Sequence, residues 1–143
     1  MIYAAEKTDL DILTALALKL WPEHEAWALR QELEELMNGG AAFFLAREGE
    51  RTVGFAQCQL RRDYVEGTES SPVGYLEGIY VEPSFRGRGM ARQLLGACEN
   101  WARSRGCREF ASDCELDNMG SLAFHLGVGF SEANRIICFV KEL

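Results

Sequence analysis

The segment from Gly78 to Leu95, GIYVEPSFRGRGMARQLL, constrains the fold more than any other part of the chain. An apolar run typical of a strand ends just before Pro83, and an amphipathic helix pattern begins directly after Gly-Arg-Gly. A second strand pattern follows that helix. Because strand, helix and strand in this order form a parallel βαβ unit, we predict strands at 75–81 and 108–114 joined by a helix over 89–105.

The rest of the chain predicts one domain, residues 1–143, in which strands pair locally and also alternate with helices. The fold class is therefore α/β, with a mixed sheet that has helices on both faces. The other expected elements are a strand at 2–6, a helix capped by Thr8 and Asp11 that stops at Trp21-Pro22, a helix at 25–37, a hairpin of strands 41–47 and 52–60, a helix at 117–126 and a last strand at 135–141.

Composition excludes several function classes. The net charge of −7 argues against a nucleic-acid partner and suits a cationic small molecule. No apolar run reaches the length of a membrane span, and the first residues form no basic-then-apolar leader, so we expect a cytoplasmic protein without a membrane partner. The 5 cysteines are odd in number and never spaced as C-x-x-C, which predicts neither a disulfide framework nor a metal site.

The turn between the strand and the helix has the composition of an anion site. Gly87 and Gly89 lack a Cβ, which permits a positive φ and a close approach of the backbone to a ligand. Successive N–H groups at a helix N-terminus attract phosphate, and Arg86 and Arg88 can add charge-assisted hydrogen bonds. We therefore predict a diphosphate at the end of strand 75–81. The alternative is a basic surface turn that only begins a helix.

This turn resembles the [Q/R]-x-x-G-x-[G/A] pattern of the GNAT superfamily of N-acetyltransferases, in which the pattern binds the pyrophosphate of acetyl-coenzyme A. The segment DNMGSLAFHLGVGF is similar to a second segment of that family, and the element order agrees throughout. The resemblance implies acetyl-CoA as co-substrate and a splayed central strand pair. It implies that the coenzyme contacts Ile79, Tyr80, Val81, Arg86, Gly87, Arg88, Gly89, Met90, Ala91 and Asn118. Asn118 also suits a helix cap.

Further segments look like the aminoglycoside 6'-N-acetyltransferases, namely LWPEH, RRDYVEG, LEGIYV and GCREFASD. This narrower resemblance implies a homodimer, and it implies Glu77 and Asp113 as catalytic residues. Carboxylates orient ammonium groups, and aromatic rings offer a platform for sugar rings and cations. Where relatives carry an acid after the GF segment, this chain has Asn134. The implied substrate contacts are Trp21, His24, Tyr64, Glu77, Asp113 and Asn134, each of which also has an ordinary packing or surface interpretation.

The expected mechanism is direct transfer, in which Glu77 accepts the ammonium proton through water and a backbone amide near Val81 polarises the thioester carbonyl. A covalent route through a cysteine ranks lower. The tyrosine that related enzymes place in the last strand, as the acid for the leaving thiolate, has no counterpart, because Phe139 and Cys138 stand there. The general acid, if there is one, is open at this point.

Two rival functions are also open. The first is a GNAT enzyme that acetylates another amine, such as a polyamine, a metabolite or a protein N-terminus. The second is a sensor that binds acyl-CoA and releases no thiol with any amine. The pair of carboxylates Glu77 and Asp113 favours an enzyme over a sensor, because a cationic amine needs both an anchor and a proton acceptor.

Overall fold

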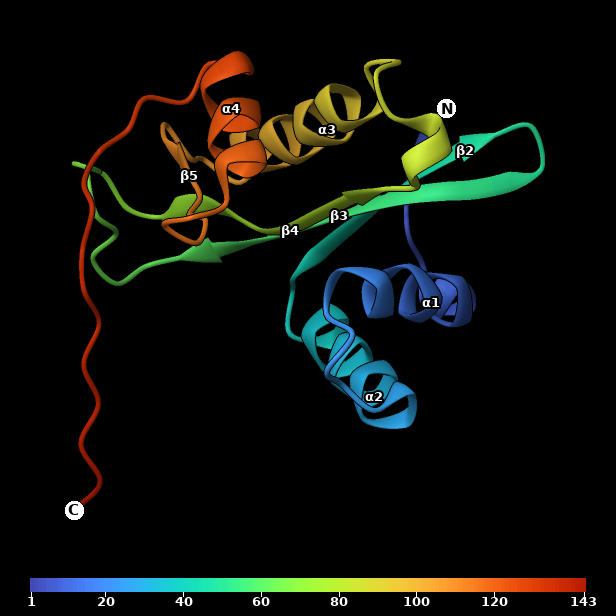
Figure 1. Ribbon diagram of the computed structural model, residues 1–143, viewed down its shortest axis with the longest axis horizontal. Coiled ribbons are helices and arrows are strands. Elements are labelled where there is room, and N and C mark those ends of the chain that lie inside the picture. Colours follow the sequence, from blue (N-terminus) through green and yellow to red (C-terminus); the bar gives the residue numbers. More distant parts are fainter.

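The computed structural model describes residues 1–143 as a five-stranded sheet with helices on both faces (Figure 1). The strands follow one another across the sheet in chain order, antiparallel from β1 to β4 and parallel between β4 and β5. This confirms the predicted α/β class, the mixed sheet and the parallel pairing within the βαβ unit. No helix is both long and apolar enough to cross a membrane. The elements are β1 (Ile2–Ala4), η1 (Lys7–Asp9), α1 (Leu10–Leu20), α2 (Ala26–Asn38), β2 (Ala42–Glu48), β3 (Arg51–Arg61), β4 (Val73–Val81), η2 (Pro83–Phe85), α3 (Met90–Ser104), β5 (Phe110–Ala111) and α4 (Met119–Gly127).

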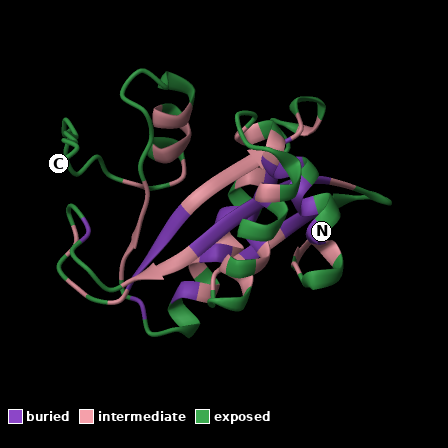
Figure 2. Ribbon diagram, turned by 90° about the horizontal axis from the view of Figure 1, so that it is seen from below, coloured by how far each residue is buried: buried purple, intermediate pink, exposed green.

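Two hydrophobic cores lie on opposite faces of the sheet. One packs α1 and α2 against β2 and β3, with Leu13, Leu33 and Phe55 almost fully buried. The other packs α3 against β3 and β4 through Leu94 and Cys98. Figure 1 shows α4 on the same face as α3, and Figure 2 shows burial concentrated along the strands and the helix faces that meet them. Because side chains alternate along a strand, successive residues within β3, and likewise within β4, point to opposite faces of the sheet.

The strands β4 and β5 separate soon after they meet. They pair only through Gly74 with Phe110 and Tyr75 with Ala111, although β4 continues to Val81. From residue 76 onward, β4 therefore has no ladder partner on this side. This confirms the splayed strand pair, and it leaves a gap that closes at the last paired residues.

A β-bulge interrupts β4 on its other side. Gln57 of β3 pairs with Gly78 and Cys58 pairs with Leu76, so that Glu77 is the extra residue of β4. A bulge re-aims the side chain of its unpaired residue and is common beside active sites. Here it places a carboxylate at the level where β4 and β5 part.

Three element predictions were wrong. The last strand at 135–141 does not form, because residues 131–143 leave the sheet as an extended tail and find no backbone partner (Figure 1). The strand at 108–114 shrinks to β5, since the residues after it have moved out of reach of β4. Thr8 does not cap α1, because it lies inside η1, which is closed by a reciprocal capping box between Glu6 and Asp9.

Candidate active site

The turn between η2 and α3 carries a row of backbone N–H groups that the chain does not use. The N–H groups of residues 87–92 have no acceptor in the chain, whereas those of Arg86 and Gln93 on either side do. Gly87 and Gly89 adopt positive φ angles of 77° and 82°, and a Cβ at either position would meet no atom within 4 Å. An open row of amides at a helix N-terminus binds anions. The predicted diphosphate fits this turn.

The two arginines of the turn are engaged with the chain itself. Arg86 donates from Nε to the carbonyl of Val81 at 2.7 Å, and its guanidinium lies over the ring of Tyr80. Arg88 lies over the ring of Phe85, 5.2 Å from the centroid. Arg86 therefore ties the turn to the end of β4. Its Nη groups and those of Arg88 are the parts that remain for a phosphate.

The other residues expected at the coenzyme offer mainly their backbone. The side chains of Ile79 and Met90 belong to the core under α3, and that of Tyr80 belongs to the core under α1. A ligand in the gap beside β4 would thus meet main-chain groups. Asn118 caps α4, because its Oδ1 accepts a hydrogen bond from the N–H of Ser121 at 3.1 Å. That cap is the alternative role that its sequence position suggested, and a coenzyme contact by Asn118 stays a prediction.

A second site lies on the opposite face, under α1 and α2, where a cavity of about 220 Å³ covers the bulge. Trp21 and His24 line it from the segment after α1, and Glu77 lines it from β4. The structure therefore brings together three of the residues that the sequence assigned to substrate. Gln57 of β3 and Glu32 of α2 join them.

The ring of Trp21 explains why the strand contains a glycine. A Cβ at Gly78 would lie 2.6 Å from one ring carbon of Trp21 and 2.7 Å from another. The same ring meets Phe55 edge-on, with centroids 5.9 Å apart. The glycine thus marks a close approach of the indole to the strand. Held on two sides, the indole forms a fixed wall of the cavity.

Glu77 and Asp113, the two predicted catalytic carboxylates, are joined through two other side chains. Arg61 donates to Oε1 of Glu77 from Nε at 3.1 Å and from Nη2 at 2.9 Å, and to Oε2 from Nη2 at 3.0 Å. The same guanidinium stacks on the ring of Tyr75, 3.4 Å from its centroid. The hydroxyl of Tyr75 donates to Asp113. The four groups form one network on the cavity face.

The tyrosine of this network stays a hydrogen-bond donor. Burial, followed by the hydrogen bond to Asp113, raises the pKa of the Tyr75 hydroxyl above its ordinary value. The phenol is therefore neutral throughout the physiological range and holds the Asp113 carboxylate in one orientation. Arg61, in turn, compensates the charge of Glu77, whose side chain is largely buried.

Tyr64 and Asn134, two of the predicted substrate contacts, lie elsewhere. Tyr64 is 78% exposed in the loop between β3 and β4. Asn134 donates from Nδ2 to Glu66 of the same loop at 2.7 Å, which fastens the start of the tail to it. Neither residue lines the cavity, so the structure does not bring them to Glu77, and substrate contact by either stays a prediction.

Buried thiols agree with the low rank of a covalent route. Cys58, Cys98 and Cys107 are buried, and all 5 cysteines are free. A hydrogen bond with Cys58, together with burial, raises the pKa of the Cys98 thiol, and burial raises the pKa of Cys107. Because the thiolate is the nucleophilic form, these thiols are poor nucleophiles.

Sequence reasoning missed Arg61, Tyr75 and Gln57. The predicted hairpin strand ended at residue 60, although β3 continues through Arg61. The alternation Phe55, Gln57, Gln59, Arg61 was the available signal, because a period of two places all four on one face of the sheet. Gln59 pairs with Tyr75 across the strands, which brings Arg61 to the same region.

Comparisons with known proteins point to the same chemistry. The model of the acetyltransferase (GNAT) family matches residues 7–130. The aminoglycoside N(6')-acetyltransferase type 1 of Stenotrophomonas maltophilia is 44% identical over 99% of this chain and 93% of its own length. That of Salmonella typhimurium is 43% identical over 95% of this chain and 94% of its own length. A solved structure of AAC(6')-Iy, in complex with the bisubstrate analogue CoA-S-monomethyl-acetylneamine, matches with a TM-score of 0.96 and 41% identity, and the match covers 100% of this chain and 98% of that one.

Proposed function

The chain belongs to the GNAT family of acetyltransferases, and we propose that it transfers the acetyl group of acetyl-CoA to the 6' amine of aminoglycoside antibiotics, which confers resistance. The observation that carries the proposal is the placement of two sites along β4. The unused amides of residues 87–92 follow one end of its splayed half, and Glu77 with its network lies at the other. From Val81 to Glu77 the strand spans about 13 Å at ~3.3 Å per residue. An extended pantetheine arm can cover that distance.

The residues of the cavity suit an aminoglycoside. Acetyl-CoA supplies an activated acetyl group as its thioester, and the substrate supplies an amine that is an ammonium ion at neutral pH. Glu77 accepts the ammonium proton. Arg61 makes one hydrogen bond to Oε2 of Glu77, so this oxygen keeps a free lone pair for the proton. Glu32 in the cavity and Asp113 at the end of the network add negative charge for the other ammonium groups. The fixed indole of Trp21 offers a face to a sugar ring. Free cysteines throughout fit a cytoplasmic location, where thiols stay reduced.

Product analysis tests this function. With acetyl-CoA, the protein should release coenzyme A thiol in the presence of kanamycin or tobramycin, and NMR with mass spectrometry should locate the acetyl group on the 6' nitrogen. Gentamicin components with a methylated 6' nitrogen should show little turnover. Polyamines and N-terminal peptides complete the panel. Turnover of a polyamine without turnover of kanamycin would leave the family assignment and refute the substrate. Coenzyme binding without thiol release from any amine would indicate a sensor.

Gln57 is expected to bind the substrate directly. Its side chain is only 6% exposed and lines the cavity beside Glu77, where the amide can reach a bound substrate. The change Gln57→Leu keeps most of the volume and removes one hydrogen bond, so the KM for kanamycin should rise roughly three- to tenfold with the KM for acetyl-CoA unchanged. Gln59→Leu, on the same face but outside the cavity, is the control. Equal kanamycin KM values in both variants would show that the Gln57 amide has no substrate partner.

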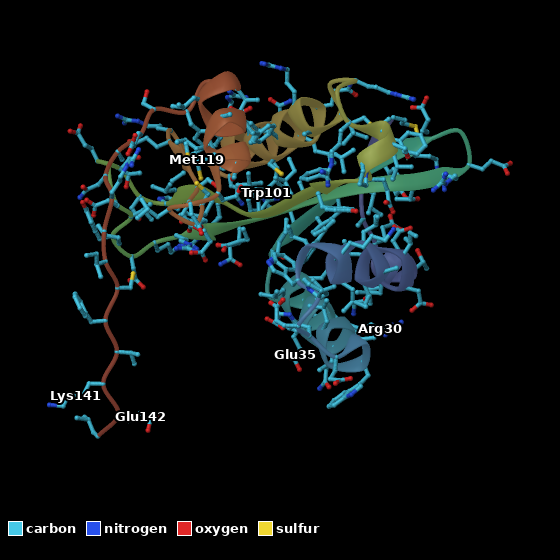
Figure 3. All side chains as sticks on the ribbon, viewed as in Figure 1. Arg30, Glu35, Trp101, Met119, Lys141 and Glu142 are labelled. Carbon is cyan, nitrogen blue, oxygen red and sulfur yellow. The ribbon has the colours of Figure 1, made fainter.

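We further propose that two copies of the chain associate through their C-terminal tails. The tail, residues 131–143, extends past the edge of the sheet and lies apart from α1 and α2 in Figure 1, and Lys141 and Glu142 in Figure 3 lie far from the sheet. Four apolar side chains within residues 135–141 are between 67% and 96% exposed, namely Ile136, Ile137, Phe139 and Val140. Such a cluster is favourable in water only when another surface covers it.

The edge of β5 offers that surface. This strand ends the sheet and has no neighbour on its outer side. Beside it lies a groove of about 450 Å³, with Ala102, Phe110, Val128 and Phe130 among its lining residues. Residues 135–141 of a second copy, added as a strand at this edge, would pair their backbone and cover their apolar side chains. Because both copies use the same two surfaces, the arrangement closes as a two-fold dimer.

Light scattering on the purified protein checks the dimer. The full-length chain should have twice the monomer mass of 16.0 kDa, and deletion of residues 135–143 should give a monomer. The double change Ile137→Asp and Phe139→Asp should do the same without shortening the chain, whereas Leu143→Asp, beyond the paired segment, should not. An unshortened chain that is monomeric at micromolar concentration would contradict the proposal.

A further inference from the structure

His125 of α4 and Ser112, the residue after β5, form a hydrogen-bonded pair that the function proposed above does not use. Nε2 of His125 lies 2.8 Å from Oγ of Ser112, and Nδ1 lies 2.7 Å from the carbonyl oxygen of Ser121. A carbonyl oxygen only accepts hydrogen bonds, so Nδ1 carries a hydrogen. The tautomer is thereby fixed, and Nε2 is the ring atom that exchanges a proton with the Ser112 hydroxyl.

Ser112 stands where β4 and β5 part. It follows the last pair of the ladder, Tyr75 with Ala111, and its Oγ lies 3.4 Å from the carbonyl of Leu76 across the gap. Leu76 directly precedes Glu77, the bulge residue. A chain that enters the gap from the phosphate turn can go no further than this point, because the strands close the gap by pairing. An arm that fills the gap to its closed end places its reactive end next to the Ser112 hydroxyl.

The imidazole is held in an apolar setting. It is partly buried, with the ring centroids of Phe130 and Phe124 at 5.0 Å and 5.8 Å. Its hydrogen-bonding partners are the hydroxyls of Ser112 and Ser121 and one backbone carbonyl, with no carboxylate among them. The hydrogen bond of Nδ1 with the Ser121 carbonyl is enough to stabilise α4. The contact of Nε2 with the Ser112 hydroxyl, where β4 and β5 part, adds nothing to that role.

We propose that His125 supplies, through Ser112, the proton that the coenzyme sulfur takes up when the thioester is cleaved. The proposal rests on the acetyl transfer described above. As the amine nitrogen bonds to the acetyl carbon, the C–S bond breaks and its electron pair goes to sulfur. The Ser112 hydroxyl gives its hydrogen to that sulfur and takes the hydrogen of the protonated Nε2, so the imidazole ends neutral. Of the three ammonium hydrogens of the substrate, one stays on the amide, one passes to Glu77 and one to solvent, from which His125 is reprotonated.

Kinetics of three variants and one control variant test the relay. His125→Gln keeps a side chain that can hydrogen-bond to Ser112 but cannot act as an acid, and Ser112→Ala removes the hydroxyl. Both should lower kcat by roughly 10- to 100-fold, at or below the lower end of the usual range for proton transfer, because a thiolate is a tolerable leaving group. Both should leave the KM for acetyl-CoA within about twofold of the original. His125→Ala should recover kcat when imidazole is added, whereas His24→Ala, which changes the other histidine, should not.

A binding experiment tests the same pair without turnover. The chain has 2 histidines, so in a His24→Gln background the imidazole ¹⁵N spectrum reports on His125 alone. Addition of free coenzyme A should shift Nε2, and the shift should be absent when Ser112 is also changed to Ala. The relay would be overturned by an unchanged kcat in His125→Gln, or by an Nε2 chemical shift that stays the same when coenzyme A is added. If only a different amine is acetylated, the substrate assignment fails, and kinetics with that amine together with the Nε2 shift decide the relay.

Discussion

Replacement of Gly89 by valine is expected to raise the dissociation constant for coenzyme A more than about a hundredfold. Gly89 directly precedes α3 and has a φ of 82°, so a valine turn would have to return to this left-handed conformation to bind, which costs about 1–2 kcal/mol. The branched side chain would also occupy the open space in front of the unused amides of residues 87–92. Loss of one charge-assisted hydrogen bond removes a further ~1.5–3 kcal/mol, and 1.4 kcal/mol corresponds to a tenfold change in affinity.

Gly96→Val supplies the matched control for this experiment. Gly96 lies in the same helix with an ordinary φ, and a Cβ there meets no atom within 4 Å. That variant should bind coenzyme A as the unchanged chain does. Calorimetric titration measures the affinities, and a thermal melt of each variant confirms folding. A folded Gly89→Val chain with undiminished affinity for coenzyme A would show that the phosphates bind elsewhere.

The part of the site formed by neighbours in sequence was predictable. The glycine turn, its positive φ angles and the following helix are all encoded within residues 86–91, because steric limits on the backbone act locally. The carboxylate of Glu77 was also visible locally, because it interrupts an apolar strand. In both cases a short stretch of residues carried the whole signal.

The pairing of Glu77 was not predictable in this way. Its partner, Arg61, is far away in sequence and resembled a loop residue, and only the strand register brings the two together. Gln57 was unremarkable in the sequence because its importance lies in its burial beside a cavity. For the tail, the sequence predicted an element that the structure lacks. Residues 135–141 have the composition of a strand, but a strand also requires a neighbour, and within one copy of the chain they have none.

Glu77→Gln is expected to lower kcat by roughly a hundredfold or more, within the range that one positioned proton acceptor contributes. The glutamine amide keeps the shape of the side chain and still accepts hydrogen bonds from Arg61, but it cannot take a proton from the substrate ammonium. The KM for acetyl-CoA should change little, because the unused amides of the phosphate turn lie at the far end of β4. Steady-state kinetics with kanamycin give both constants.

Arg61→Met separates the proton acceptor from a merely structural carboxylate. This variant breaks the same ion pair, with contacts of 2.9 to 3.1 Å, but leaves the carboxylate of Glu77 in place. If Glu77 accepts the proton, Arg61→Met should retain a far higher kcat than Glu77→Gln, even though both lose stability. If Glu77 serves only to hold Arg61 on the ring of Tyr75, the two variants should lose kcat equally. Equal losses would remove Glu77 as the proton acceptor and leave Asp113, on the other side of Tyr75, as the remaining carboxylate of the network.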